Sequence, residues 1–411
     1  MLKQNLNVKR IQYIGLLLII AGLFICLFQL RWQIIFALTG SQRFYIWAIN
    51  FVALSGYMSL VITNISTFKK PELFIILSIT ISFIPVAISK YMFGFGAGSF
   101  IVYVTCCILP ISLITLNVDY EVLKNSLAIL MIIINIIFIA LAVGFLIDKF
   151  FDRAMIKWLG SFMTANTTFS RFAQPTSEET SRYFSIFGHP LLTSFVANMF
   201  LVLNIVSRRQ NISHTLPNTI SFILSLIITA GTASKTSIFV IFLIALICFY
   251  NNKKMLIGGF VFILLFSAIG MFDSLLDRIL QNSLSSGRIE ALQQFLSATE
   301  FPLHLFYGYA NTEITNAQYF AAFEFPIVLS AFEYGILFMF LFIIAPFLYV
   351  TYHLIKTRQY SIYFFWLTLF AQVNTYPTLA QGYDHPWFFY FISFILLQFA
   401  KHNFWLSSEK H

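Results

Sequence analysis

The sequence predicts an all-α polytopic membrane protein with about 12 transmembrane helices and two long extracytoplasmic loops. Hydrophobic residues make up 59% of the 411 residues and charged residues only 10%. A soluble domain carries roughly a quarter charged residues, so this chain has too few to cover a surface that faces water. Apolar runs of roughly 17 to 25 residues, long enough to cross a bilayer as a helix, recur along it.

Two polar stretches divide these apolar runs into three groups. We expect N-terminal spans in residues 1–147, an outer loop at 148–189 and central spans in 190–272. A large outer loop follows at 273–326, and C-terminal spans with a short cytoplasmic tail occupy 327–411. The expected spans lie near residues 11–30, 44–65, 72–89, 99–117, 125–147, 190–206, 217–233, 236–250, 255–272, 327–350, 360–376 and 386–400.

The distribution of charge predicts which helix ends face the cytoplasm. With the N-terminus inside, the cytoplasmic segments hold 14 basic and 4 acidic residues, and the outer segments hold 11 basic and 12 acidic residues. Cytoplasmic loops of membrane proteins carry such an excess of Lys and Arg. We therefore expect a multi-pass protein with both termini in the cytoplasm. The net charge of +9 reflects this bias, and we expect no nucleic-acid partner.

Several classes of enzyme and pump are disfavoured by missing motifs. The cytoplasmic connections are short, and the sequence has no P-loop and no nucleotide-binding fingerprint. This argues against an ATP-driven pump and against a transferase that uses a cytoplasmic sugar nucleotide. No set of His, Cys and carboxylates has zinc spacing, and no Asp-x-Asp pair indicates Mg²⁺. We therefore expect a site that needs no metal and no other cofactor.

The first outer loop begins with a segment that has helical periodicity. Its apolar residues recur at helical spacing, with charged residues on the other faces. This pattern predicts an interfacial helix on the outer leaflet, and a helix buried within an outer domain is the alternative. The apolar positions are Phe151, Met155, Trp158, Leu159 and Phe162.

Four basic residues are candidates for binding a phosphate or pyrophosphate. Lys235 follows Thr-Ala-Ser in a short turn between two apolar runs, where a Lys that merely snorkels is the alternative. Arg288 follows Ser-Ser-Gly at the expected start of a helix near Ser286, whose backbone N–H groups would also favour an anion. A surface ion pair with Glu290 or Asp277 is its alternative role. Arg171 and Arg182 lie in the first loop, where charge also serves solubility.

Three residues are candidates for a general base. Glu324 lies just before the tenth expected span and Glu333 within its first turns. A carboxylate there can take a proton or pair with a nearby cation. His189 precedes Pro190 at the start of another span, where it can equally cap or pair within the bundle. Asp384 and His385, in the last outer loop, form a weaker pattern of the same kind.

Several of these short motifs, taken in their order along the chain, resemble those of a known family. They are Phe-Gly-His189-Pro190 leading into a span, Thr-Ala-Ser-Lys235 between two spans and Ser-Gly-Arg288 opening the large loop. Leu-Phe-Tyr-Gly308-Tyr and Phe-Glu333-Tyr-Gly335 follow. Over roughly residues 180–345 the chain resembles the O-antigen polymerase (Wzy) and O-antigen ligase superfamily, and within it the polymerases of capsular polysaccharide and exopolysaccharide.

The resemblance implies a fold and a reaction. Such proteins are GT-C-like, metal-independent, inverting glycosyltransferases that face outward and use a glycan linked to undecaprenyl pyrophosphate. It implies that Arg288 binds the pyrophosphate of the carrier. Two departures stand out: the turn that usually carries Ser-Arg has Ser-Lys235, and the His-Asn pair typical of ligases is missing from the region between Asn316 and Glu324. The missing His favours a polymerase over a ligase.

The sequence thus leads us to expect a polysaccharide polymerase of the bacterial cytoplasmic (inner) membrane. Its alternatives are an O-antigen ligase-type transferase, a transporter or flippase of lipid-linked oligosaccharides, and an accessory protein without catalysis. The expected partners are an undecaprenyl-pyrophosphate-linked oligosaccharide, membrane lipid, and chain-length regulator and flippase proteins.

Overall fold

The computed structural model of the chain is built from helices. It describes residues 2–27, 49–162, 182–183, 185–187, 189–249, 270–281, 288–297, 301–310, 324–375 and 385–408, with single residues at 259, 261, 264, 267, 268 and 379. These residues contain no β-strand. The elements are α1 (Leu2–Leu27), α3 (Phe51–Asn64), α4 (Lys70–Met92), α5 (Ala97–Tyr103), η1 (Val104–Ile108), η2 (Leu109–Thr115), α6 (Tyr120–Phe150), α7 (Ala154–Phe162), η4 (Ser185–Phe187), α9 (Pro190–Arg209), α10 (Asn218–Thr232), α11 (Lys235–Phe249), α13 (Asp273–Gln281), α14 (Arg288–Ser297), α15 (Pro326–Tyr334), α16 (Ile336–Met339), η6 (Phe340–Ile344), α17 (Ala345–Lys356), α18 (Tyr360–Val373) and α20 (His385–Ser408).

The protein is a helical membrane protein by the length and composition of its helices. Six described segments are long and apolar enough to cross a bilayer. They are Leu6–Phe24, Lys70–Met92, Ala97–Thr115, Tyr120–Phe150, Pro190–Arg209 and Ile336–Lys356. Four shorter apolar helices are α3, α10, α11 and α18. The span expected at 255–272 lies mostly outside the described residues, and the count of twelve stays a prediction.

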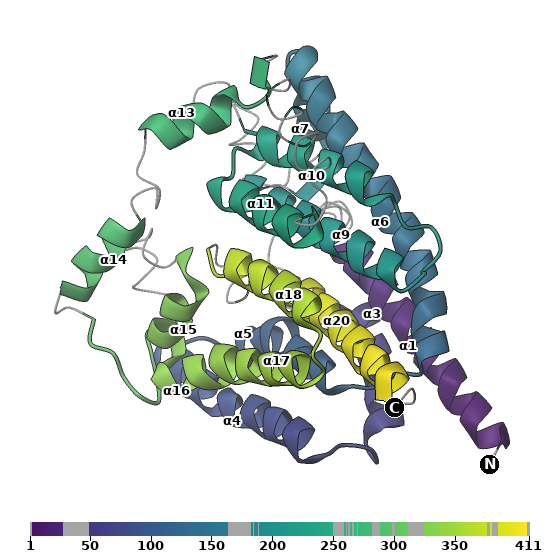
Figure 1. The fold of residues 1–411 in the computed structure, drawn as a ribbon. Helices are drawn as coiled ribbons and strands as arrows, with labels where there is room; N and C mark the ends of the chain where they lie inside the picture. The colour runs from purple at the N-terminus through teal and green to yellow at the C-terminus, as the bar shows by residue number, and fades with distance from the viewer. Residues whose placement is uncertain are drawn as a thin grey trace.

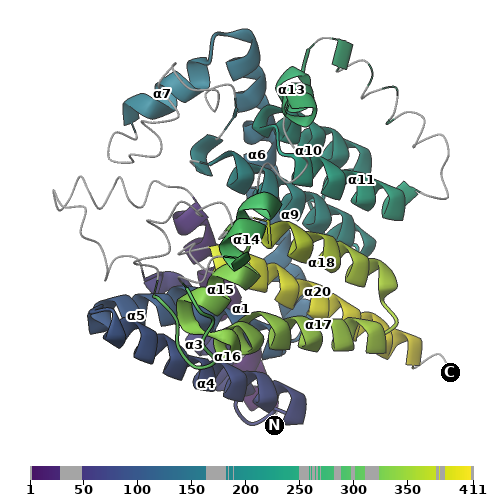
Figure 2. The same cartoon turned by 90° about the vertical axis from the view of Figure 1, so that its left-hand side faces the viewer.

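The helices form a bundle whose two ends differ. Both chain termini lie at one end, which we call the terminus end (Figure 1). The opposite end, which we call the loop end, carries the short helices α7, α13 and α14 (Figure 1). Figure 2 views the bundle from the side of α14, which lies in front of the longer helices beside α15, with α7 and α13 above. Helices α9 and α11 both begin at the loop end, so their N-termini face the same side.

Helix α9 is the buried centre of the bundle. Its spanning window is 94% buried, and it packs against α6, α10, α11, α18 and α20. Two amides tie it to its neighbours. The Asn198 amide donates to Gln372 Oε1 on α18 at 3.0 Å and accepts from the Ser225 hydroxyl on α10 at 2.9 Å. Asn204 donates to Asn135 Oδ1 on α6 at 2.8 Å. Within a bilayer these groups need protein partners, because no water is there to replace them.

Helices α1 and α3 approach closely through glycines. The absence of a side chain at Gly56 leaves room for the backbone of Gly15, and a Cβ there would overlap the Gly15 carbonyl. A Cβ at Gly22 would lie 2.5 Å from the Ala53 nitrogen. Small residues of this kind let membrane helices pack backbone to backbone, where dispersion rather than hydrophobic burial drives association.

The helix expected at the start of the first outer loop is present as α7. Its buried side chains are Ile156 and Leu159, whereas Trp158 is 55% exposed. Asp148, near the end of α6, accepts a hydrogen bond from the Ile156 backbone N–H at 2.9 Å and so holds the start of α7 against α6. The helix therefore presents one face to the bundle and an exposed Trp away from it. Its position in the outer leaflet stays a prediction.

Because α1 and α3 approach closely at Gly56, a methyl group added at that position should destabilise the protein. We expect Gly56→Ala to lower the melting temperature of the purified protein, because overpacking costs about 1–3 kcal/mol. Gly98→Ala is the matched control, since a Cβ at Gly98 in α5 meets nothing within 4 Å. Thermal unfolding in one detergent compares the two. Equal melting temperatures for both variants would contradict the packing described for α1 and α3.

Candidate functional site

His189 stands at the N-terminus of α9, at the loop end. Its backbone is extended, its Nδ1 accepts a hydrogen bond from the Leu191 N–H at 3.2 Å, and Pro190 occupies the first helical position. A proline is favoured there because its missing N–H is one that the helix would leave unused. The sequence His-Pro therefore starts α9 and fixes the direction of the imidazole.

Three basic side chains act electrostatically on His189. Burial, and to a smaller extent the charges of Arg182, His385 and Arg288, together lower the pKa of His189 to about 3. These residues come from four separate segments, so the fold brings them within electrostatic reach of one imidazole. We call Arg182, His189, Arg288 and His385 the basic cluster. At neutral pH the His189 imidazole is uncharged. The permanent positive charge of the basic cluster therefore comes from Arg182 and Arg288.

Arg182 is buried against the end of α10. Its Nε donates to the carbonyl oxygen of Thr232 at 2.9 Å, and the next residue, Tyr183, donates its N–H to the Gly231 carbonyl at 2.8 Å. The last carbonyls of a helix carry partial negative charge and have no partner within the helix, so a guanidinium there is favourable. This contact places Arg182 beside the turn that leads to Lys235.

The turn between α10 and α11 positions Lys235. Ala233 takes the left-handed conformation, with φ of 49°, and ends α10. The Ser234 hydroxyl then accepts a hydrogen bond from the Ser237 N–H at 3.3 Å, a Ser cap at the start of α11. Lys235 is the first residue of α11 and is half-buried. It therefore lies at the positive end of that helix dipole, on the same side of the bundle as Arg182.

Arg288 forms an ion pair with Glu324. Helix α14 begins at Arg288, and the guanidinium Nε donates to Glu324 Oε2. The two side chains are 19% and 23% exposed. The partner is therefore Glu324 on the approach to α15, not the Glu290 or Asp277 considered from the sequence. The expected helix start at Ser286 lies outside the described residues.

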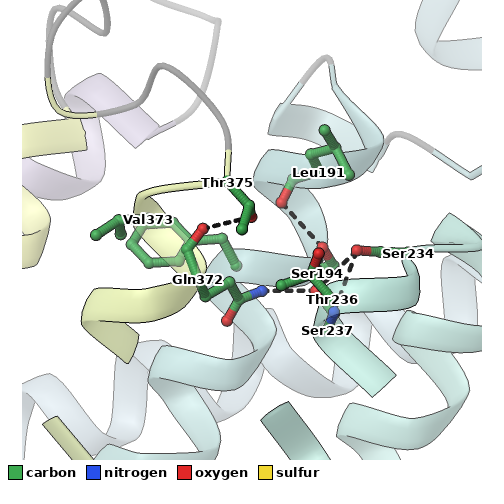
Figure 3. Close-up of a pocket in the computed structure, with 9 residues that line it drawn as sticks. Leu191, Ser194, Ser234, Thr236, Ser237, Gln372, Val373 and Thr375 are labelled. Atoms are coloured by element: carbon green, nitrogen blue, oxygen red, sulfur yellow. Dashed lines mark hydrogen bonds between the residues drawn. The ribbon is translucent and has the colours of Figure 1, made fainter. Parts of the chain in front are cut away.

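A hydroxyl-lined cleft opens between the N-termini of α9 and α11 and the C-terminus of α18 (Figure 3). Ser237 is its centre: its hydroxyl donates to Ser194 Oγ at 2.7 Å and accepts from the Gln372 amide at 2.6 Å. The cleft has about 10 Å³ of open space, roughly that of a single water molecule. Its lining residues are Leu191, Ser194, Phe195, Ser234, Thr236, Ser237, Gln372, Val373 and Thr375.

The sequence did not single out Gln372, Ser194 or Asn198. One sequence feature could have indicated them. They are polar residues within apolar helices, and such side chains need hydrogen-bond partners elsewhere in the protein. Ser194 and Asn198 are four residues apart on α9, which puts them on one face. Asn198 pairs with Gln372, 174 residues away, and Ser194 accepts from Ser237. Local periodicity does not predict such long-range pairs.

Glu333 lies in a second cluster, apart from the basic cluster. It is 1% exposed in α15 and attracts the Lys90 ammonium of α4. That ammonium donates to Ser99 Oγ at 3.0 Å and lies 4.7 Å from the centre of the Phe95 ring. Two charges of opposite sign thus compensate one another in a site with little solvent.

The chain preceding α15 crosses over this second cluster. Residues 301–310 run against the break between α15 and α16, where Gly335 has φ of +99°. Ala310 donates its N–H to the Glu333 carbonyl at 2.9 Å, and Ile336 donates to the His304 carbonyl at 3.0 Å. Gly308 donates to the Ser89 hydroxyl of α4 at 2.8 Å. These bonds satisfy backbone groups that the helix break leaves without helical partners.

The structure thus brings four of the seven candidates to one region and a fifth beside it. His189, Arg182, Arg288 and Glu324 meet at the basic cluster, and Lys235 begins the adjacent helix. Glu333 is elsewhere, and Arg171 lies outside the described residues. His385, a weaker candidate, belongs to the cluster. In the described part of the chain no three His, Cys, Asp or Glu side chains are grouped as metal ligands.

Comparisons with known proteins do not assign a family. No protein-family model matches the chain, and no curated protein matches it significantly in sequence. The function therefore has to be argued from the site itself.

The environment of His189 predicts a pH effect on stability. Its pKa is about 3 in the folded protein and about 6.5 in an unfolded chain. Protonation therefore favours unfolding, and the stability that His189 contributes is complete above about pH 6.5 and is lost as the pH falls toward 3. We expect the melting temperature of the wild type to fall more steeply between pH 7.5 and 5 than that of His189→Asn.

Asn is the informative replacement because it keeps the helix cap but cannot take the proton. Melting curves of both proteins in one detergent across this pH range make the comparison. Parallel pH profiles would show that His189 is not held neutral by its surroundings.

Proposed function

We propose that the protein is a polysaccharide polymerase at the outer face of the bacterial cytoplasmic membrane. In this proposal the basic cluster and Lys235 bind the pyrophosphate of an undecaprenyl-pyrophosphate-linked glycan. The observation that carries it is the convergence of Arg182 and Arg288 on His189, at the N-terminus of α9 and beside that of α11. The excess of basic residues on the opposite side of the membrane supports the outward orientation of this end.

The arrangement suits a phosphate more than other ligands. Guanidinium groups bind phosphate oxygens in pairs of hydrogen bonds, and a helix N-terminus adds partial positive charge and N–H donors. The N-termini of α9 and α11 flank the hydroxyl-lined cleft, whose open space of about 10 Å³ suits a bound water and not a sugar. A soluble phosphate would reach such a site from water, but its position at the end of spanning helices favours a phosphate carried by a lipid.

The proposed reaction is a glycosyl transfer with inversion. A hydroxyl of the acceptor repeat unit attacks the anomeric carbon of the donor glycan, and the bond from that carbon to the pyrophosphate oxygen breaks. Undecaprenyl pyrophosphate leaves with the bonding electrons, and a base takes the proton of the hydroxyl. Arg182, Arg288 and Lys235 would stabilise the charge that grows on the leaving pyrophosphate.

Glu324 is the base that the geometry favours among the three candidates. It is partly exposed and lies at the basic cluster, so an acceptor hydroxyl can approach it. His189 has a pKa of about 3, and its Nδ1 already accepts the hydrogen bond that caps α9. It is therefore a weak base at neutral pH. Glu333 is 1% exposed and offers a substrate no access. Substrate binding would have to draw Arg288 from Glu324 toward the pyrophosphate.

Removing one cation should reduce polymer formation. We expect Arg288→Ala and Lys235→Ala each to lower transfer by about 10²-fold or more, the usual cost of losing one group that stabilises transition-state charge. Lys157→Ala is the control, because Lys157 is an exposed cation near the loop end that pairs with Asp152 at 2.6 Å. Glycans from cells with matched membrane levels of each variant are compared on gels.

Three outcomes of this experiment would contradict the proposal. Normal-length polymer from both variants would exclude the pyrophosphate site. Repeat units that accumulate on the cytoplasmic side would indicate a transporter or flippase, since a polymerase defect leaves single repeat units exposed outside. Loss of attachment to a non-carrier acceptor, with polymer length unchanged, would indicate the ligase alternative.

The choice of base gives a separate prediction. We expect Glu324→Gln to lower kcat by about 10²- to 10⁴-fold, because an amide cannot take the proton of the acceptor hydroxyl. Glu333→Gln should retain transfer but lower the melting temperature, because it leaves the Lys90 charge without compensation. Purified variants are assayed for rate and for thermal unfolding. If Glu333→Gln abolished transfer and Glu324→Gln retained it, Glu333 would be the base.

A further inference from the structure

A polar pocket lies at the terminus end, remote from the basic cluster. It has a volume of about 210 Å³ and opens between the start of α6 and the last turns of α20. Pockets for drug-sized ligands begin at about 300 Å³, so this one suits a smaller group. Its lining residues are Asn117, Val118, Tyr120, Leu123, Gln398, Lys401 and His402. We call it the terminus-end pocket.

The walls of the pocket are fixed by hydrogen bonds. The Gln398 amide donates to the Leu116 carbonyl at 2.9 Å and accepts from the Val118 N–H at 3.3 Å, which ties α20 to the segment before α6. The Tyr120 and His402 rings stack with centres 3.4 Å apart. A site held in this way binds a ligand at little cost in conformational entropy.

Lys401 supplies the charge of the pocket. Its ammonium donates to Asn117 Oδ1 at 2.7 Å, and an ammonium has three N–H groups to give. The Asn117 amide nitrogen lies on the same side chain, so a further hydrogen-bond donor lies next to the cation. Lys69 also acts on Lys401 as a like charge. Oxygen atoms of an anion are the partners that such donors select.

The acidic residues near the pocket are engaged with other groups. Asp119 caps α6 by accepting from the Glu121 and Val122 N–H groups and pairs with Lys9 at 2.8 Å. Glu72 attracts Lys401 but also accepts from the Lys69 N–H at 3.2 Å. Glu121 acts on His402 from an exposed position. At the pocket, the one Glu72 carboxylate thus faces two ammonium groups, Lys401 and Lys69, and positive charge remains.

We propose that the terminus-end pocket binds the phosphate of a phospholipid headgroup. The pocket lies at the ends of the long apolar helix α6 and of α20, which is the level of lipid headgroups in a bilayer. Phosphate is the abundant anion at that level, and basic pockets between transmembrane helices bind such groups. The lipid would join the start of α6 to the end of α20. This binding does not depend on the proposed transferase activity.

The test uses the full-length protein in detergent, with phosphatidylglycerol as the probe and native mass spectrometry as the readout. We expect one tightly retained lipid, and we expect Lys401→Gln to weaken its retention by about tenfold or more, since charged hydrogen bonds contribute most to such binding. Lys356→Gln is the control, because Lys356 is an exposed cation at the end of α17. It should leave retention unchanged.

A second variant keeps the test valid if Lys401→Gln unfolds the protein. Asn117→Asp keeps a partner for Lys401 and adds a negative charge that repels phosphate, so it should lose the lipid while melting normally. Retention equal to wild type in Asn117→Asp would overturn the proposal. Displacement of the lipid by millimolar inorganic phosphate would overturn the lipid as ligand and assign the pocket to free phosphate.

Discussion

The burial of α9 is the constraint on which the rest of the structure depends. A helix enclosed by other helices in a bilayer can carry polar side chains only if neighbouring helices satisfy them. Asn198 meets this condition with groups from α10 and α18, and Asn204 with a group from α6. Each such bond is worth only about 0.6 kcal/mol on average, so their main effect is to set the register of the helices rather than to hold them together.

That register is what assembles the site. Asn198 sets α9 against α10 and α18, and Ser237 sets α11 against both α9 and α18, so the N-termini of α9 and α11 come to the same side. Arg182 then attaches to the end of α10, next to the turn before Lys235. Arg288, at the start of α14, joins from the loop end and is already paired with Glu324. In the proposed function, a substrate anion would compete with Glu324 for Arg288. Binding of the anion to Arg288 would then leave the Glu324 carboxylate able to accept a proton.

Much of the helical framework is predictable from the sequence, because apolar length and helix-starting residues are local signals. His189-Pro190 stands where α9 begins, as its sequence indicates, whereas the helix start expected near Ser286 stays a prediction. The partners of these residues are not local. Glu324 lies 36 residues from Arg288, and His385 reaches His189 from the last helix. Glu333 looked equivalent to Glu324 in the sequence, and only the path of residues 301–310 shows that it is enclosed beside Lys90.

The proposed function requires this membrane protein to transfer a lipid-linked glycan without another enzyme. The most direct measurement supplies purified protein in lipid nanodiscs with an undecaprenyl-pyrophosphate-linked repeat unit and no other enzyme, metal or nucleotide. We expect chains longer than one repeat, with one undecaprenyl pyrophosphate released for each bond formed. Unchanged single repeats, from protein that melts cooperatively and retains the lipid-linked substrate, would contradict it.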